Sequence, residues 1–361
     1  MVGIGMSYLS RVRRFVESLR GDGLSGALLR SPANIFYFTG YRGTGYFLVP
    51  VDGFPTLYVS PLNFELAEES VPGDIQVIKL EQGSDIRRVF ELIPESLKTR
   101  IGFDAMAVED YLKVSGQLVG SMMPVSKHIW KLRMVKDESE IEKIRRACEI
   151  SSRCMELASE LLGEGLTEYE VKSEILREML SLGGDGPAFD PIVASGPNSS
   201  KPHGVYRNRM IERGDVVVID LGVIYEGYCS DITRTFYLGP GSNEVSRVHQ
   251  AVSEAKRRAE ELIRIGVRAS EIYHAAHGVL ASAGYADYFL HALGHGVGIE
   301  IHEPPRLFRD SEEILTEGMV ITVEPGVYFP KRFGVRIEDT ILIKRDGVER
   351  LTSAPYELAL G

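Results

Sequence analysis

Two aspartates frame an apolar hairpin near the middle of this 361-residue chain. The run Val216 to Ile219 is typical of a buried strand and leads into Asp220, and Asp231 follows eleven residues later. Tyr225-Glu226-Gly227-Tyr228 between them predicts a hairpin turn, with Gly at the awkward backbone angle. If Asp220 pairs with Asp231, the centre of the turn falls within about one residue of the centre of this motif, and a β-bulge could account for the difference. Two neighbouring carboxylates at the end of an apolar strand repel each other unless a cation lies between them.

The hairpin has a counterpart later in the chain. ERGDVVVIDLGVIYEGYCSDITRTFYL and TEGMVITVEPGVYFPKRFGVRIEDTILI each contain a charged residue with Gly, an apolar strand and then an acid. Asp220 corresponds to Glu324, and the two return strands carry Asp231 and Glu338. Single strand-plus-acid patterns recur by chance, but a match in strand, acid, turn and second acid indicates duplication. We therefore expect two α/β halves that face one another across a pseudo-twofold axis within one domain.

A Gly-His-Gly turn between the two hairpins supplies a nitrogen ligand. His295 lies in LHALGHGVGIEIHE, residues 290–303, where the glycines allow the backbone to pass close to a metal cluster. Four carboxylates with one imidazole form a ligand set for two divalent ions such as Mn²⁺, Co²⁺, Zn²⁺ or Fe²⁺. Taken singly, a strand-end Asp can cap a turn, His295 can be a core histidine, and Glu338 can pair with Arg336. The set is more specific than its members, because it couples both hairpins to the Gly-His-Gly turn.

These motifs resemble those of a known family. The ligand order is similar to that of the pita-bread dinuclear metallopeptidases. The segments VIDLG, SDITRT, LGHGVGIEIHE, TVEPGVY and VRIEDT resemble the proline-specific branch, particularly microbial prolidases. The resemblance extends to NIFYFTGY in the first half and to the connector KLRMVKDESEIEKIRRA, so it covers nearly the whole chain. It implies a creatinase-like N-terminal α/β domain followed by a pita-bread catalytic domain.

The resemblance assigns a metal role to each acid. It implies two ions per subunit, with Mn²⁺ or Co²⁺ favoured and Zn²⁺ or Fe²⁺ as alternatives. Five ligands are implied: Asp220 on one ion, His295 and Glu324 on the other, and Asp231 and Glu338 as bridges. Two cations that share a water molecule lower the pKa of that water towards neutrality. Glu324 would also act as the general base that takes the proton of this water.

Five further positions match substrate-binding or supporting residues of the family. His203, His291 and His302 match catalytic histidines that contact the substrate and the tetrahedral intermediate. Arg306 resembles the arginine that binds the free carboxylate of a dipeptide, for which a bidentate guanidinium is suited. The alternative for Arg306 is a solvated arginine beyond a Pro-Pro turn. Arg336, two residues before Glu338, would steady the carboxylates.

The elements that must position these residues form two domains of mixed α/β (α+β) class. The first, residues 1–130, begins with a helical pattern from Leu9 to Leu19 that ends at Gly21-Asp22-Gly23. Short apolar runs follow at 27–29, 35–38, 46–49 and 56–59, and a turn at Asp52-Gly53 predicts a hairpin between the last two.

The second domain, residues 131–361, begins with long helices. Asp137 caps a helix that starts at Glu138 and runs to about Leu162. Thr167 with Glu170 forms a capping box for the next helix. Two more helices fit 243–265 and 269–283, before the histidine-rich run and the last acid-bearing strands.

Composition excludes several classes of partner. A net charge of −10 without a basic stripe argues against nucleic acid. The N-terminal segment lacks a secretory apolar region, and no run approaches the length of a membrane span, so no membrane partner is expected. Three cysteines give neither a disulfide framework nor a CxxC motif, which favours a reducing, cytoplasmic location. The resemblance implies a homodimer.

The leading hypothesis is a metal-dependent peptidase that hydrolyses the bond before proline in Xaa-Pro dipeptides. Aminopeptidase P, which acts on longer Xaa-Pro peptides, is the alternative, and Arg306 favours the dipeptidase. A metal-free binding protein on the same fold and a creatinase-like hydrolase are disfavoured, because all five ligands are present.

Overall fold

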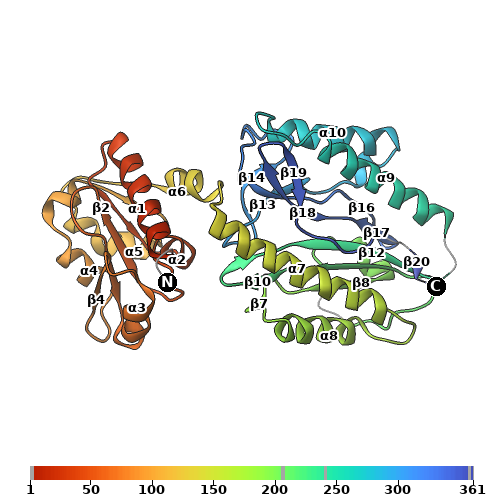
Figure 1. The fold of residues 1–361 in the computed structure, drawn as a ribbon, viewed down its shortest axis with the longest axis horizontal. Coiled ribbons are helices and arrows are strands. Elements are labelled where there is room, and N and C mark those ends of the chain that lie inside the picture. Colours follow the sequence, from red (N-terminus) through yellow and green to blue (C-terminus); the bar gives the residue numbers. More distant parts are fainter. Residues whose placement is uncertain (1–3, 205–207, 240–241, 357–358, 361) are drawn as a thin grey trace. The chain divides into compact units, whose positions relative to one another are not determined.

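The structure is a computed structural model that describes residues 4–204, 208–239, 242–356 and 359–360. The chain divides into two compact units, Met1–Arg133 and Met134–Gly361, both drawn in Figure 1. Among the helices of the described ranges, none combines the length and the apolar character needed to cross a bilayer.

The first unit is built on a six-stranded sheet of order β4-β3-β2-β1-β5-β6. Strand β2 runs antiparallel to both of its neighbours, and the other neighbouring pairs are parallel. The strands are β1 (Gly26–Leu29), β2 (Tyr46–Pro50), β3 (Thr56–Val59), β4 (Gln76–Lys79), β5 (Arg100–Phe103) and β6 (Ser121–Pro124). The helices are α1 (Ile4–Gly21), α2 (Pro32–Thr39), α3 (Phe64–Ser70), α4 (Ile86–Leu92), α5 (Val108–Val114) and α6 (Ser126–Arg133), with 3-10 turns η1 (Pro61–Asn63), η2 (Glu95–Thr99) and η3 (Ser115–Gln117).

The predicted hairpin of the first unit is confirmed, since Tyr46 pairs with Tyr58 across β2 and β3. Of the four short apolar runs, three are strands, but the run 35–38 lies within helix α2. Every α2 residue from Asn34 to Thr39 is buried. A helix buried on all sides has no polar stripe, so its sequence cannot be told from a buried strand by periodicity.

Within its described residues, the second unit contains two pairs of helices and four sheets. The helices are α7 (Glu138–Leu161), α8 (Glu168–Ser181), α9 (Asn243–Glu260) and α10 (Ala269–Ser282), with 3-10 turns η4 (Gly196–Ser200) and η5 (Ala286–Tyr288). The sheets have the orders β11-β10-β7, β20-β12-β9-β8, β14-β13-β15-β18-β19 and β16-β17. The strands are β7 (Gly186–Pro187), β8 (Ile192–Ser195), β9 (Val216–Leu221), β10 (Val223–Tyr225), β11 (Tyr228–Cys229), β12 (Ile232–Leu238), β13 (Gly294–Gly296), β14 (Glu303–Leu307), β15 (Val320–Val323), β16 (Gly326–Phe329), β17 (Phe333–Arg336), β18 (Asp339–Lys344), β19 (Gly347–Arg350) and β20 (Ala359–Leu360).

Each pair of helices covers its own set of strands, as Figure 1 shows with α9 and α10 above the strands and α8 below them. Ile175 of α8 and Ile219 of β9 belong to one fully buried core, and Val252 of α9 and Ile321 of β15 belong to another. The capping boxes predicted for α7 and α8 are both formed. The two halves expected from the sequence repeat therefore have separate cores.

Both repeats fold as long hairpins, each with an outer and an inner pair of strands. In the first, β9 pairs with β12 and β10 with β11; in the second, β15 pairs with β18 and β16 with β17. The expectation that Asp220 lies opposite Asp231 is wrong, because Asp220 pairs with Thr233. The turn is the two-residue loop Glu226-Gly227, with φ of 45° and 83°, so its centre lies one residue later than assumed. Because side chains alternate with a period of two, the two-residue shift preserves which face each residue occupies.

The return strands of the two hairpins meet along a seam. The Glu338 backbone N–H donates to the Thr233 carbonyl oxygen at 3.1 Å. The Thr340 hydroxyl donates to the Asp231 carbonyl oxygen at 2.8 Å. Two acids from different hairpins are thus held on directly bonded stretches of backbone.

Arg234 reinforces this seam from inside the protein. Its side chain is 2% exposed and pairs with the Asp339 carboxylate, with Nη2 to Oδ1 at 2.9 Å. It also donates to four backbone carbonyls, those of Thr233, Glu338, Ala354 and Pro355. One guanidinium therefore satisfies acceptors from β12, from the β17–β18 junction and from the C-terminal segment.

We expect Arg234→Met to lower the free energy of unfolding by about 3–5 kcal/mol, because it removes the charge facing Asp339 and leaves buried carbonyls without donors. Denaturant unfolding measures the difference. Arg146→Met is the matched control: Arg146 pairs with Glu149 on the surface of α7, and its loss should change stability by less than about 0.5 kcal/mol. Equal effects for the two variants would contradict the assigned role of Arg234.

Candidate active site

All ten residues singled out from the sequence line one cavity of the second unit. The cavity has a volume of about 710 Å³ and also contains Phe189, Ile192 and Glu313. The ten are His203, Asp220, Asp231, His291, His295, His302, Arg306, Glu324, Arg336 and Glu338. They come from both repeated hairpins, from the segment between them and, for His203, from the loop before the first hairpin, so only the folded chain brings them together.

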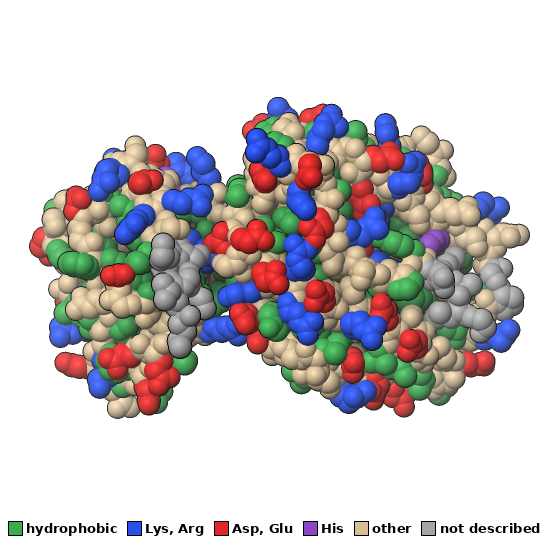
Figure 2. All heavy atoms as spheres, viewed as in Figure 1, with side chains coloured by type: hydrophobic (Ala, Val, Ile, Leu, Met, Phe, Trp, Pro, Cys, Tyr) green, Lys and Arg blue, Asp and Glu red, His purple; other side chains and the backbone are tan. Residues whose placement is uncertain are grey.

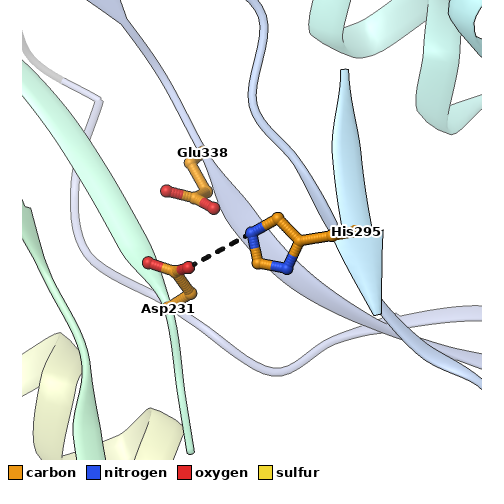
Figure 3. Close-up of side chains that lie close together, drawn as sticks. All are labelled: Asp231, His295 and Glu338. Carbon is orange, nitrogen blue, oxygen red and sulfur yellow. Dashed lines mark ion pairs between the residues drawn. The ribbon is translucent and has the colours of Figure 1, made fainter. Parts of the chain in front are cut away.

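Three of the expected metal ligands form a compact cluster. Asp231, His295 and Glu338 each offer one ligand atom, and these atoms lie within 4.8 Å of one another. Figure 3 shows the three side chains pointing towards a common centre, from three separate segments. His295 Nε2 lies 3.6 Å from Asp231 Oδ2 and 3.3 Å from Glu324 Oε1. Glu324 is therefore next to the same imidazole.

Close backbone approach explains the glycines on both sides of His295. A Cβ at Gly294 would collide with the Thr322 carbonyl, and one at Gly296 would collide with the Pro304 carbonyl. Strand β13 lies between β14 and β15, with a register shift between His295 and Gly296. Glycine lets the neighbouring strands pack against this short segment and bring the imidazole to the acids.

Asp220 is joined to the cluster through Arg336. Arg336 Nη2 donates to Asp220 Oδ2 at 2.5 Å, and Nε donates to Thr233 Oγ1 at 3.1 Å. The Thr233 hydroxyl in turn donates to Glu338 Oε2 at 2.6 Å. A single chain of hydrogen bonds thus runs from the acid of one hairpin to an acid of the other. Thr233 was not singled out from the sequence, since a strand threonine has no distinguishing pattern.

The carboxylates oppose one another's ionisation. Burial and the charge of Glu338 raise the pKa of Asp231 well above its usual value. Burial and the charge of Glu324 do the same to the pKa of Glu338. The pKa of Asp220 is raised by burial, partly offset by Arg336. At Glu324, burial is outweighed by the hydrogen bond and charge of His295, which lower the pKa to about 2.

Two orphaned oxygens test whether this site fits metal ions. Among the described residues, Asp220 Oδ1 and Asp231 Oδ1 are buried and have no hydrogen-bond partner. A buried carboxylate oxygen without a partner is costly, and a coordinated cation removes that cost. Oxygen-rich donors with one imidazole suit divalent ions of the Mn²⁺ to Zn²⁺ series. The residues present therefore fit the two expected ions.

His291 uses both of its ring nitrogens inside the protein. Nδ1 lies 2.7 Å from the Ala292 carbonyl oxygen, to which it can only donate. In the neutral ring, Nε2 is then an acceptor for the Tyr328 hydroxyl at 2.9 Å. Tyr328 itself accepts from Arg336 Nη1 at 2.7 Å. The sequence reading missed Tyr328, which is 1% exposed on β16 and reads as an ordinary strand aromatic.

The other two histidines, His203 and His302, and Arg306 also line the cavity, and each is more exposed than His291. The His302 ring centre lies 4.4 Å from that of His295, and burial lowers the pKa of His302, which favours the neutral ring. His203 is exposed in the loop after η4. The Arg306 guanidinium lies over the Phe308 ring at 4.4 Å. Among the described residues no carboxylate pairs with it.

Comparison with known proteins agrees with this geometry. Residues 11–135 match the Creatinase/Prolidase N-terminal domain, and residues 142–345 match Metallopeptidase family M24. The chain belongs to metallopeptidase family M24. This membership confirms the predicted family and fold class, a creatinase-like N-terminal domain followed by a pita-bread catalytic domain. M24 metallopeptidases use divalent metal ions, which agrees with the donor set of the cavity.

Individual M24 relatives are similar over almost their full length. A Xaa-Pro dipeptidase of Pyrococcus furiosus is 40% identical over 350 residues, which cover 96% of this chain and 99% of that protein. The crystal structure of a prolidase from Pyrococcus horikoshii has a TM-score of 0.91 and 37% identity, covering 97% and 99% of the two chains. An X-Pro aminopeptidase from Thermotoga maritima has a TM-score of 0.85 and 34% identity, covering 95% and 100%.

We expect Asp231→Asn to lose bound metal while keeping the fold. The amide keeps the shape of the carboxylate but removes the charge that holds a cation and repels its neighbours. Elemental analysis after reconstitution with Mn²⁺ should find two ions per chain in the wild type and at most one in the variant. Denaturant unfolding without metal should show equal or higher stability for the variant. Asp310→Asn, at an exposed turn, is the control and should retain both ions; full metal content in Asp231→Asn would refute a ligand role for Asp231.

Proposed function

We propose that this protein is a metal-dependent Xaa-Pro dipeptidase that hydrolyses the peptide bond before proline. The observation that carries the proposal is that four carboxylates, the His295 imidazole and an arginine without a carboxylate partner among the described residues line one cavity. The similarity to the Xaa-Pro dipeptidase of Pyrococcus furiosus supports the same activity.

The five ligands proposed are Asp220, Asp231, His295, Glu324 and Glu338. Asp220 would hold one ion, His295 and Glu324 would hold the other, and Asp231 and Glu338 at the hairpin seam would be shared between them. Two ions held there would activate a water molecule and offset negative charge on the substrate oxygen. We propose Mn²⁺ or Co²⁺ as the ions, with Zn²⁺ or Fe²⁺ as alternatives, because the donor set accepts each of them.

Glu324 is proposed as the proton carrier of the reaction. Its carboxylate takes a proton from the water that attacks the carbonyl carbon. The C–N bond to proline then breaks, and the same carboxylate delivers the proton to the proline nitrogen. The Thr322 hydroxyl donates to Glu324 Oε1 at 3.4 Å and accepts from the backbone N–H of His295 at 3.1 Å. It therefore keeps the Glu324 carboxylate beside the His295 imidazole.

The histidines of the cavity are proposed to divide the remaining work. His203 and His302 donate N–H groups to the substrate and to the oxygen on which negative charge develops. His291 was expected to contact the substrate in the same way, and it remains a proposed catalytic residue that lines the cavity. The His291 ring is hydrogen-bonded to Tyr328, Tyr328 accepts from Arg336, and Arg336 donates to Asp220. Because these bonds connect the ring to a proposed metal ligand, His291 is also proposed to orient that ligand.

Arg306 is proposed to select the length of the substrate. The Arg306 guanidinium, which lies over the Phe308 ring, is suited to a two-point contact with the free carboxylate of a dipeptide. In a longer peptide an amide replaces this carboxylate, and the charge pair is lost. Aminopeptidase P is the second candidate, because the X-Pro aminopeptidase of Thermotoga maritima has a closely similar fold.

We also propose a cytoplasmic homodimer. Three free, buried cysteines agree with a reducing compartment. The dimer rests on the family resemblance and is tested by light scattering of the purified protein.

Purified protein reconstituted with Mn²⁺ or Co²⁺ should hydrolyse Leu-Pro and Met-Pro faster than Leu-Pro-Gly. The free carboxylate next to the scissile bond is present only in the dipeptides. Release of free proline measures the first reaction, and chelator-treated protein is the blank. Cleavage of the tripeptide with no action on dipeptides would replace the dipeptidase with aminopeptidase P.

Arg306→Ala should raise the KM for Leu-Pro by about 10- to 100-fold, since a charge-assisted pair contributes about 1.5–3 kcal/mol. Hydrolysis of Leu-Pro amide, which lacks the carboxylate, should change little. Arg309→Ala is a close control, because Arg309 stacks on the same Phe308 ring at 5.0 Å and does not belong to the cavity lining. If both variants act alike on Leu-Pro, Arg306 does not recognise the carboxylate.

A further inference from the structure

A buried ion pair lies at the wall of the cavity, where Glu303 is one of the lining residues and Lys136 is its partner. Lys136 Nζ is 3.2 Å from Glu303 Oε2, and each side chain is only 1% exposed. Lys136 lies three residues after the end of the first compact unit, and its backbone N–H donates to the Gly318 carbonyl at 2.9 Å. Neither residue has a role in the reaction proposed above. Because the desolvation of two buried charges offsets much of their attraction, stability alone does not explain the position of this pair.

The Glu303 carboxylate organises the loop that carries His302. The loop runs from 297 to 302, between β13 and β14, and Glu303 follows it immediately. Glu303 Oε1 accepts the backbone N–H of Glu300 at 3.1 Å, so the carboxylate closes the loop on itself. A Cβ at Gly298 would lie 2.5–2.7 Å from this carboxylate, which shows how tightly the loop folds around it. Lys136 holds the carboxylate in that position from the other side.

A second residue of the same connector reaches the other active-site hairpin. Glu140 Oε1 accepts the Tyr228 hydroxyl at 3.1 Å in the buried interior, while Oε2 accepts the Asp137 N–H at 3.0 Å. Cys229, which follows Tyr228 in the chain, donates its backbone N–H to the Gly298 carbonyl oxygen at 2.7 Å. The hairpin that ends at Asp231 and the loop that ends at His302 are therefore bonded to each other.

We propose that Lys136 and Glu303, with Glu140 as a second support, are positioning residues for the reaction. They hold the 297–302 loop so that the His302 imidazole faces the substrate beside His295. This inference rests on the proposed function, because it gives His302 its task. The pair acts through backbone geometry: the Lys136 charge fixes the Glu303 carboxylate, the carboxylate fixes the Glu300 N–H, and the loop presents His302.

The test separates positioning from stability with a charge-neutral double variant. Lys136→Met alone leaves the buried Glu303 carboxylate without the Lys136 charge, so it is expected to destabilise the protein and cannot decide the question. Lys136→Met/Glu303→Gln removes both charges and keeps both volumes, so it should unfold at nearly the wild-type denaturant concentration. Its kcat/KM for Leu-Pro should nevertheless fall about tenfold or more, mostly in kcat, with both metal ions retained.

A matched control and a double-mutant cycle identify the residue through which the pair acts. Lys98→Met removes another buried lysine, 5% exposed and paired with the exposed Glu95 in the first unit, and should leave kcat/KM unchanged. In the His302→Ala background, the double substitution should cause no further loss of residual activity. Losses that multiply in that background, or wild-type activity of a stable double variant, would overturn the proposal.

Failure of the proposed function is recognised separately. If wild-type protein cleaves no Xaa-Pro substrate, the activity is wrong, but the position of His302 can still be measured. Its ring signal in ¹⁵N-histidine spectra is assigned by its absence in His302→Ala. The signal should shift or broaden in Lys136→Met/Glu303→Gln and stay unchanged in Lys98→Met. An unchanged signal in the double variant would refute the positioning role.

Discussion

Repulsion among buried carboxylates is the constraint on which the rest of this structure depends. Burial raises the pKa of Asp220, Asp231 and Glu338, and the negative charge of Glu324 raises each of them further. Arg336 and Thr233 relieve part of this repulsion through direct hydrogen bonds, and two oxygens remain without a partner among the described residues. Divalent cations would offset the remaining repulsion, so the same feature that makes charge unfavourable in the cavity favours the binding of metal ions.

Such a site requires rigid support, and the duplicated architecture provides it. Each half packs its own helices over its own hairpin, and the return strands are then bonded across the seam. The acids come from strand ends rather than from long loops, so their backbone positions follow from sheet register. Arg234 neutralises Asp339 immediately beside Glu338 and binds the carbonyls on both sides of the seam.

Much of the fold could be predicted because its signals are local. The capping boxes of α7 and α8, the Gly227 turn and the repeated strand-acid pattern each depend on neighbouring residues. Helix α2 escaped prediction because a helix buried on all sides has no periodicity. The register of the first hairpin was missed because the two acids were assumed to lie opposite each other, whereas the turn at Glu226-Gly227 places Thr233 opposite Asp220.

The sequence by itself determined the family, the two-part architecture and the chemical types of the ligands, since each depends on residue identity and spacing along the chain. Only the tertiary structure decided which side chains meet. Tyr328, between His291 and Arg336, and Lys136, against Glu303, carry no local pattern and acquire their partners through contacts 8 to 167 residues apart. Spacing along the chain can indicate a ligand. The contacts that orient this ligand join residues distant in sequence, and they exist only after the strands have packed.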